Sequence, residues 1–387
     1  MSSVVTVRPR AGGPNEAGAE VSWGSETFVV EESANVSLYN SATAWLAPGL
    51  AIAMEHAMPL RIDGEVDAQA LSTTGPAQDL LVSWWPEKMT RISIDAPTTT
   101  EPARDGRGVG CFFSGGVDSF YSVVANQSEI THLVFVHGFD IFLNNQKYYE
   151  RTLADLRRAA ADLGKELIEV RTNIRHLYEG YRGGWDLGHG VALAHVALLL
   201  SEHLHTVLVP ASHAESNLEP YGTHPELDPL WSSSATSVVY DGLEATRVMK
   251  AQLIKNSDAA MRNLRVCWWN RTDRKNCGEC EKCVRTAINM RIAGAGDRCT
   301  ALPAIDPVRA LPRVVLDEES GLFFVRENLD AMRAAGVHDP ELEAALEQAL
   351  QRGAVDKLRA QFWQGLVVGK VLSMSLRERL AERLQRA

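Results

Sequence analysis

The 387-residue sequence lacks two common phosphate-binding patterns. It has no GxxxxGK[ST], the loop in which kinases and GTPases hold a phosphate with a lysine, and no GxGxxG, the dinucleotide-binding fingerprint. It also has no apolar run near the roughly 18 residues of a membrane span, and its first residues, MSSVVTVRPR, lack the apolar stretch of a signal peptide. We therefore expect a cytoplasmic protein without a membrane-spanning segment.

Basic residues are in the minority. Lys and Arg number 39 against 49 Asp and Glu, which gives a formal net charge of -10. A negative chain argues against the broad positive surface with which proteins bind tRNA or DNA, although a local basic groove is compatible with it. We therefore expect a small-molecule substrate and no nucleic-acid partner.

The sequence has only six cysteines, and four of them stand close together in the pattern C-x9-C-x2-C-x2-C. Two short CxxC turns let pairs of thiolates face one ion, and Gly278 permits a tight turn between them. Clustering of this kind differs from the scattered cysteines of a disulfide framework. The pattern predicts a structural Zn²⁺ site, with an iron–sulfur cluster as the alternative. Its expected ligands are Cys267, Cys277, Cys280 and Cys283.

A glycine turn stands between an apolar strand and a helix in the stretch Gly110–Tyr121, GCFFSGGVDSFY. Paired glycines let backbone N–H groups converge on an anion, and the start of a helix adds its positive end. Asp118 would repel a polyphosphate unless a divalent cation such as Mg²⁺ lies between them. The pattern predicts a phosphate site, against the alternative of an ordinary turn. Its expected residues are Ser114, Gly115, Gly116, Val117, Asp118 and Ser119.

The six residues SGGVDS resemble the pyrophosphate loop of the N-type ATP pyrophosphatases. Together with the later four-cysteine cluster, this loop is similar to that of 7-cyano-7-deazaguanine synthase, over about residues 108–294. The resemblance implies cleavage of ATP to AMP and pyrophosphate, transfer of AMP to a substrate oxygen, and a structural zinc. The chain departs from that family because it carries residues 20–98 and 305–387 as well.

Composition divides the chain into five segments. Strands and helices alternate from Val109 to Tyr240, which predicts an α/β fold with a parallel sheet and helices on both faces; the resemblance implies an adenine nucleotide alpha-hydrolase-like fold. Leu80–Trp85 is expected to form a strand. The apolar faces of the C-terminal helices suit packing on the core or in a homodimer. The expected segments are a flexible tail (1–19), an N-terminal α+β domain (20–98), a linker (99–107), the ATP pyrophosphatase domain (108–300) and a helical region (301–387).

Ligands of parallel sheets bind at the carboxyl ends of the strands. Gly138 and Phe139 follow the second strand, and we expect them to line the adenine and ribose pocket unless they form a plain turn. The long loop Pro210–Ser234 contains four prolines and follows a later strand, so it is the expected substrate site, with a solvated loop as the alternative. Its polar residues are His213, Glu215, Asn217, Tyr221, His224 and Asp228.

Arg247 and Lys250 lie three residues apart on the next helix and can neutralise pyrophosphate or a substrate carboxylate. The alternative for both is a solvated helix face. The residues expected to take part in the chemistry are Asp118, Ser119, His224, Asp228, Arg247 and Lys250.

These residues together predict an ATP-dependent adenylating enzyme of the synthetase or ligase class. A nitrogen, sulfur or water nucleophile would then displace AMP, and a donor protein would supply ammonia or sulfur if neither is taken up free. Two other functions stay open. One is a thioamide-forming sulfur transferase acting on a nucleobase or tRNA, and the other is a non-catalytic nucleotide sensor.

Overall fold

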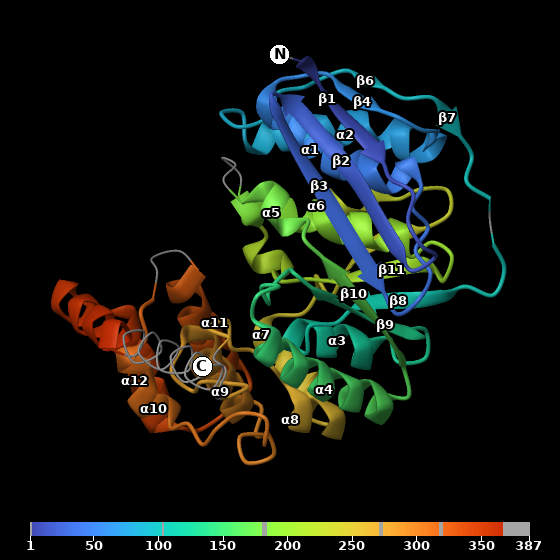
Figure 1. The fold of residues 1–387 in the computed structure, drawn as a ribbon. Helices are drawn as coiled ribbons and strands as arrows, with labels where there is room; N and C mark the ends of the chain where they lie inside the picture. Colours follow the sequence, from blue (N-terminus) through green and yellow to red (C-terminus); the bar gives the residue numbers. More distant parts are fainter. Residues whose placement is uncertain (1, 103, 180–183, 271–273, 317–319, 367–387) are drawn as a thin grey trace, which may run out of the picture. The chain divides into compact units, whose positions relative to one another are not determined.

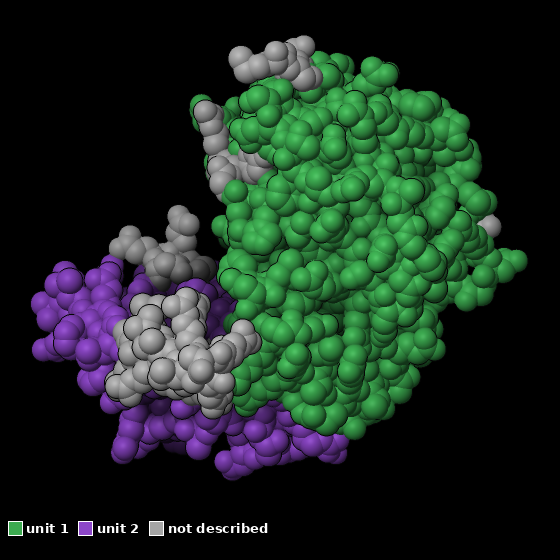
Figure 2. Space-filling view, in the orientation of Figure 1, with its two compact units in different colours: residues 1–114, 118–245 green, residues 115–117, 246–387 purple. Residues whose placement is uncertain are grey.

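The computed structural model describes residues 2–366 except 103, 180–183, 271–273 and 317–319. The chain forms two compact units, shown in different colours in Figure 2. Unit 1 comprises residues 1–114 and 118–245, and unit 2 comprises residues 115–117 and 246–387. No helix among the described residues is long and apolar enough to cross a membrane.

Unit 1 is built on one sheet of ten strands in the order β12-β11-β8-β9-β10-β3-β2-β1-β4-β6 (Figure 1). Strands β8 to β12 are parallel to one another, and β3, β2 and β1 continue the sheet in antiparallel pairings. Strands β4 and β6 then join β1 in parallel pairings. The prediction of an α/β fold with a largely parallel sheet is confirmed. The strands are β1 (Ser2–Pro9), β2 (Glu16–Gly24), β3 (Glu26–Ala34), β4 (Leu60–Ile62), β6 (Ile94–Asp95), β8 (Gly108–Phe112), β9 (His132–His137), β10 (Glu166–Thr172), β11 (Leu204–Pro210) and β12 (Ser237–Asp241), with β5 (Val66–Asp67) and β7 (Thr98–Thr99) as a separate pair.

Helices cover both faces of this sheet because successive strand residues point to opposite sides. On one face Phe113 packs edge-on against Phe120 of α3, and Phe135 stacks on Tyr149 of α4. On the other face Phe112 joins a core that includes residues of α1 and α6. The helices of unit 1 are η1 (Ala42–Trp45), α1 (Leu46–His56), α2 (Ala68–Trp84), α3 (Val117–Ala125), α4 (Gln146–Leu163), α5 (Arg175–Tyr178), α6 (Gly184–Leu199), η2 (Glu215–Asn217) and η3 (Asp228–Trp231).

The N-terminal residues belong to the main sheet. Strand β1 lies between β2 and β4, and its Val5 and Val7 are fully buried. Strand β3 pairs with β10 through Glu32 and Thr172, so apart from the short pair β5–β7 the strands of residues 20–98 belong to the main sheet. The expectations of a flexible tail at 1–19 and of a separate domain at 20–98 are wrong, because the Gly- and Pro-rich composition of residues 11–19 does not show the long-range strand pairing.

The expected linker at 99–107 is anchored. Glu101 is only 6% exposed and accepts hydrogen bonds from Ser41 Oγ (2.9 Å) and Ser233 Oγ (3.3 Å). Arg107 donates to the carbonyls of Ser201 and Ala235. The linker prediction is therefore wrong, since a linker makes few contacts of this kind.

The strand predicted at Leu80–Trp85 is also wrong. These residues form the last turns of α2, which continues past Pro76. Gly75 and Pro76 usually interrupt a helix, so the sequence pattern does not predict one helix across them. In the folded chain α2 continues through both residues.

The described residues of unit 2 form helices joined by loops. Its core includes Val284 and Ile288 of α9, Met332 of α11, and Leu342 and Leu346 of α12. The helices are α7 (Arg247–Ile254), α8 (Asp258–Asn263), α9 (Glu281–Ile292), α10 (Pro307–Ala310), η4 (Leu311–Arg313), α11 (Ser320–Ala334) and α12 (Pro340–Leu350), followed by helical residues 354–366.

For the last described helix, two arrangements of the apolar face were expected, packing on the core or in a homodimer, and the structure does not show the first. Leu358, Phe362 and Leu366 are exposed, Phe362 to 67%. The helix expected at Ser375–Arg386 lies outside the described residues.

Candidate functional site

The strand order of unit 1 reverses direction at β8. Strands β9 and β10 continue to one side of β8, whereas β11 and β12 continue to the other. Ligands of open α/β sheets bind where the order reverses, outside the carboxyl ends of the strands. The loops that leave β8 and β11 are therefore the expected walls of a ligand site; the first contains Ser114 and the second follows Pro210.

The turn after β8 has the predicted form of strand, glycine and helix. Gly115 has φ +77, a left-handed conformation that favours glycine. Helix α3 then begins at Val117, with Asp118 in its first turn, and Ser119 is buried. Within unit 2, the Gly115 carbonyl accepts a hydrogen bond from Arg265 N (2.7 Å). The backbone is thus arranged as in an anion-binding turn at a helix N-terminus.

Tyr240 of β12 connects two of the predicted site residues. Its hydroxyl donates a hydrogen bond to the His213 carbonyl (3.3 Å). Burial raises the pKa of Tyr240, and the nearby charges of Asp228 and Asp118 raise it further. Asp118 and Asp228 therefore both lie within electrostatic reach of one phenol. Tyr240 was not predicted. Its position near the end of a parallel strand was the signal in the sequence that could have identified it.

Asp228 is a buried acid, 1% exposed, in the loop after β11. Its Oδ1 accepts a hydrogen bond from His224 N (3.1 Å), while its Oδ2 has no hydrogen-bond partner among the described residues. Burial raises the pKa of Asp228 well above its ordinary value. The carboxyl group therefore keeps its proton to a higher pH than an exposed aspartate does, and it can donate a hydrogen bond.

His224 lies beside Asp228, as the loop assignment predicts. Its Nδ1 accepts from Glu226 N (3.1 Å), so Nε2 carries the ring proton of the neutral form. Burial lowers the pKa of His224, and its ring lies 4.7 Å from that of Trp84 on α2. The solvated-loop alternative therefore does not describe His224 or Asp228.

A second group of aromatic and titratable residues joins this loop to α6. Tyr221 lies 4.6 Å from His189 and 5.3 Å from His213, measured between ring centroids. Burial, followed by the charges of Asp186, Asp140 and Glu219, raises the pKa of Tyr221 to about 12. Burial also lowers the pKa of His189.

His189 was missed because the sequence pattern started the helix at Gly190. A Cβ at Gly190 would overlap the Gly222 carbonyl, so a residue without a side chain lets α6 approach the loop. The pattern Gly-His-Gly at residues 188–190 was the available signal.

Gly138 and Phe139, which were expected to line the adenine pocket, have structural roles in the fold. Gly138 has φ +113, and a Cβ there would overlap the Thr172 carbonyl. Phe139 is buried and packs against Trp185, and its carbonyl accepts from Arg175 Nη1 (2.6 Å). The carbonyl of Phe139 is thus already hydrogen-bonded within the protein.

The two predicted cations lie on α7 in unit 2, while His224 and Asp228 lie in unit 1, so the structure does not place the four in one described site. Arg247 N donates to Glu327 Oε1 (3.1 Å). Lys250 is only 2% exposed, which contradicts the solvated-face alternative for this residue. A lysine is rarely buried unless a partner compensates its charge.

The four predicted cysteines form one buried group whose sulfur atoms all lie within 4.8 Å of one another. The Sγ atoms of Cys277 and Cys283 are 3.8 Å apart, and those of Cys267 and Cys280 are 3.9 Å apart. Four sulfurs at Zn–S bonds of about 2.3 Å in a tetrahedron would be separated by about 3.8 Å. The group can therefore hold a metal ion such as zinc.

The surrounding backbone suits thiolate ligands. The N–H groups of Glu279 and Cys280 point at Cys277 Sγ (3.3 and 3.2 Å), and Gly278 supplies the turn with φ +78. The remaining cysteines, Cys111 and Cys299, are buried outside this group.

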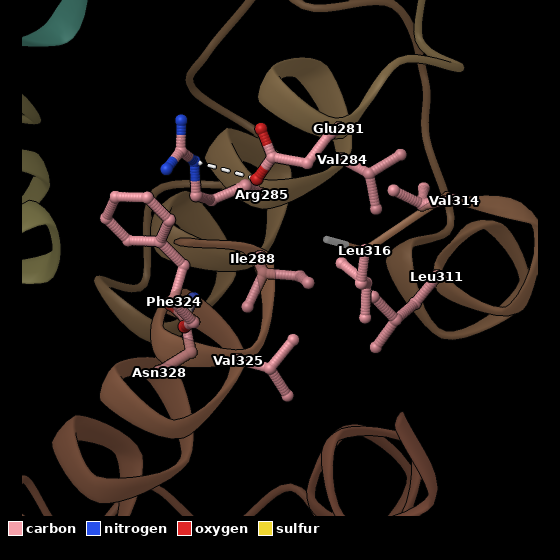
Figure 3. Close-up of a pocket in the computed structure, with 11 residues that line it drawn as sticks. Glu281, Val284, Arg285, Ile288, Leu311, Val314, Leu316, Phe324, Val325 and Asn328 are labelled. Carbon is pink, nitrogen blue, oxygen red and sulfur yellow. Dashed lines mark hydrogen bonds and ion pairs between the residues drawn. The ribbon is translucent and has the colours of Figure 1, made fainter. Parts of the chain in front are cut away.

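A small cavity in unit 2 lies beside the cysteine-bearing helix but lacks the character of a polar site (Figure 3). Its volume is about 10 Å³, room for about one water molecule. Val284, Ile288 and Leu311 line it, and Arg285 at its edge pairs with Glu281 (3.1 Å). It is a packing gap between helices.

Searches of protein-family models, of curated proteins and of solved structures return no match to this chain.

Replacing Asp228 tests its protonation. Since its pKa is raised in the folded protein, the native state keeps a proton that the unfolded chain loses above about pH 4, and stability falls as the pH rises towards the folded value. Asp228→Asn lacks this dependence and keeps the acceptor for His224 N. Its free energy of unfolding should gain on the parent by up to about 1.4 kcal/mol per pH unit in this window. Denaturant titrations from pH 4 to 8 measure it.

The control is Asp297→Asn, at an exposed carboxyl group. The stability difference between this variant and the parent should be flat over the same pH range. A flat difference for Asp228→Asn as well would show that Asp228 is ionised in the folded protein.

Cys280→Ser tests the metal site. The variant should lose the bound metal, about one ion per chain, and several kcal/mol of folding free energy, because a structural zinc site contributes its binding energy to folding. Cys299→Ser replaces an equally buried cysteine outside the group and should keep the metal. Elemental analysis with thermal unfolding compares them. Equal metal content in both variants would refute the assignment.

Proposed function

We propose that this chain is an ATP-dependent adenylating enzyme that cleaves ATP to AMP and pyrophosphate. The single observation that supports it most is the turn Ser114–Ser119, with a left-handed Gly115 between the central strand β8 and α3. The turn stands where the strand order reverses and has no lysine to hold a γ-phosphate. It therefore suits a pyrophosphate leaving group better than a transferred γ-phosphoryl group.

The proposed reaction has two steps. A lone pair of a substrate carbonyl or carboxylate oxygen forms a bond to the α-phosphorus, while the bond from that phosphorus to the α,β-bridging oxygen breaks and pyrophosphate leaves with the electron pair. A nitrogen nucleophile then attacks the adenylated carbon, loses a proton to a base or to solvent, and AMP leaves with the electrons of the C–O bond. Positioning and electrostatic stabilisation supply most of the rate in such transfers.

Individual residues have distinct proposed roles. The hydroxyls of Ser114 and Ser119 and the backbone of Gly115 bind phosphate oxygens. Asp118 orients a Mg²⁺ ion, which would neutralise the charge that develops on pyrophosphate. Asp228, protonated by burial, donates a hydrogen bond to the substrate, and His224 lies beside it.

The cysteine group holds a structural Zn²⁺, since its four ligands leave no position open for a substrate. Sulfur transfer is the weaker alternative. All six cysteines are buried, so a thiol that carries sulfur would have to come from a partner protein. We therefore favour a small carbonyl or carboxylate substrate, such as a nitrogen heterocycle, with a nitrogen nucleophile.

Product analysis tests this function. The chain is incubated with Mg·ATP, ammonium and a panel of small carboxylates and lactams, and the nucleotides are separated by chromatography. AMP and pyrophosphate should form in equal amounts, whereas ADP as the main product would contradict the proposal. Asp118→Asn should lower turnover by roughly a hundredfold or more with little change in the KM for ATP. Asp162→Asn, an exposed carboxylate on α4, is the control and should turn over normally.

A further inference from the structure

The N-terminal region forms hydrogen bonds with the loop that follows β11. Asp67, fully buried just before α2, accepts hydrogen bonds from Ala70 N and Ser234 N at Oδ1 and from Glu101 N and Ser234 Oγ at Oδ2. Burial alone would raise the pKa of Asp67, but these hydrogen bonds lower it. One carboxylate thus joins the start of α2, the segment before β8 and the end of the loop.

Helix α2 makes two more contacts with the same loop. Thr73 Oγ1 lies 2.6 Å from the Leu230 carbonyl in η3. Trp84, at the end of α2, packs edge-on against His224 at 4.7 Å. In the sequence Asp228 lies between His224 and Leu230, and its carboxyl group is buried.

A second set of buried hydrogen bonds holds α6, which also contacts the loop. His195 of α6 is fully buried between the Ala44 carbonyl (Nδ1, 2.7 Å) and Glu32 of β3 (Nε2 to Oε2, 2.8 Å). A carbonyl only accepts, so Nδ1 carries a proton, and one more proton lies between Nε2 and Oε2. The pair is therefore neutral overall and can stay buried. At its other end α6 contacts the loop, where Gly222 N donates to the Asp186 carbonyl (3.0 Å).

From these contacts we propose that residues 1–101 form a rear wall of the substrate site and fix its geometry. They act through the loop: Thr73 and Asp67 are positioning residues for η3, which carries Asp228, and Trp84 sets the environment of His224. The identity of the bound substrate rests on the proposed function, whereas the contacts that hold the loop in place do not depend on it. It gives a purpose to N-terminal strands that the ATP pyrophosphatase pattern does not require.

Neighbouring threonines provide the test. Thr73→Val removes the contact with Leu230 together with a bond to Ala70 within the helix. Thr74→Val, the next residue of α2, removes a similar bond within the helix, to Leu71, but no contact with the loop. Amide hydrogen exchange in the full chain reports on the N–H groups of Leu227, Asp228 and Leu230, which bond within the loop. Their exchange should be about fivefold faster in Thr73→Val and unchanged in Thr74→Val. Equal exchange in the two variants would overturn the proposal.

The environment of His224 gives a second readout, which global destabilisation would not move. Trp84→Leu should raise the pKa of His224 towards its ordinary value, because the ring loses the neighbour that helps to bury it. Trp85→Leu removes an adjacent indole and should leave that pKa unchanged. Titration by NMR, with the signal assigned from His224→Gln, compares them. Equal changes of the His224 pKa in the two variants would contradict the proposed role of Trp84 in the rear wall.

Activity separates this inference from the proposed function. If the parent chain releases pyrophosphate, Thr73→Val should raise the KM of the carboxylate or lactam substrate severalfold and leave the KM of ATP unchanged. An unchanged substrate KM alongside faster exchange would overturn the role in substrate binding. An inactive parent chain would refute the proposed function, while the exchange and titration results would still decide whether the loop is braced.

Discussion

The pairing of β3 with β10 is the constraint on which unit 1 depends. It joins the antiparallel N-terminal strands to the parallel strands, so that a single sheet extends from β12 to β6. With a common sheet there is a common core, in which Val5 and Val7 of β1 belong to the same apolar cluster as Val238 of β12. The N-terminal residues are thus part of the scaffold that holds the loops after β8 and β11.

The same arrangement explains the chemistry of the loop after β11. Because α2, α6 and Glu101 contact this loop, Asp228 and His224 lie away from water. Burial raises the pKa of Asp228 and lowers that of His224. Both groups are thereby favoured in their neutral forms. A neutral acid and a neutral imidazole can donate and accept hydrogen bonds without repelling an anionic nucleotide.

Local patterns in the sequence predicted the parts of the structure that depend on local physics. The glycine turn at Ser114–Ser119, the parallel strands after it and the spacing of the four cysteines are all properties of short segments. Helix α2 was misread because Gly75 and Pro76 interrupt its pattern, and the strand at Ser2–Pro9 was missed because only its partners β2 and β4 stabilise it. Tyr240 and His189 were missed although each had a signal in the sequence, the end of a parallel strand and the Gly-His-Gly pattern respectively, because their importance comes from neighbours distant in the sequence.

Binding of pyrophosphate to the turn after β8 directly tests whether this turn is a phosphate site. Backbone amide signals of the isotope-labelled full chain are followed by NMR while magnesium pyrophosphate is added. We expect saturable shifts at Gly115, Gly116 and Ser119, the residues of the turn and of the first part of α3. Absence of shifts at these amides, or shifts confined to another part of the chain, would contradict it.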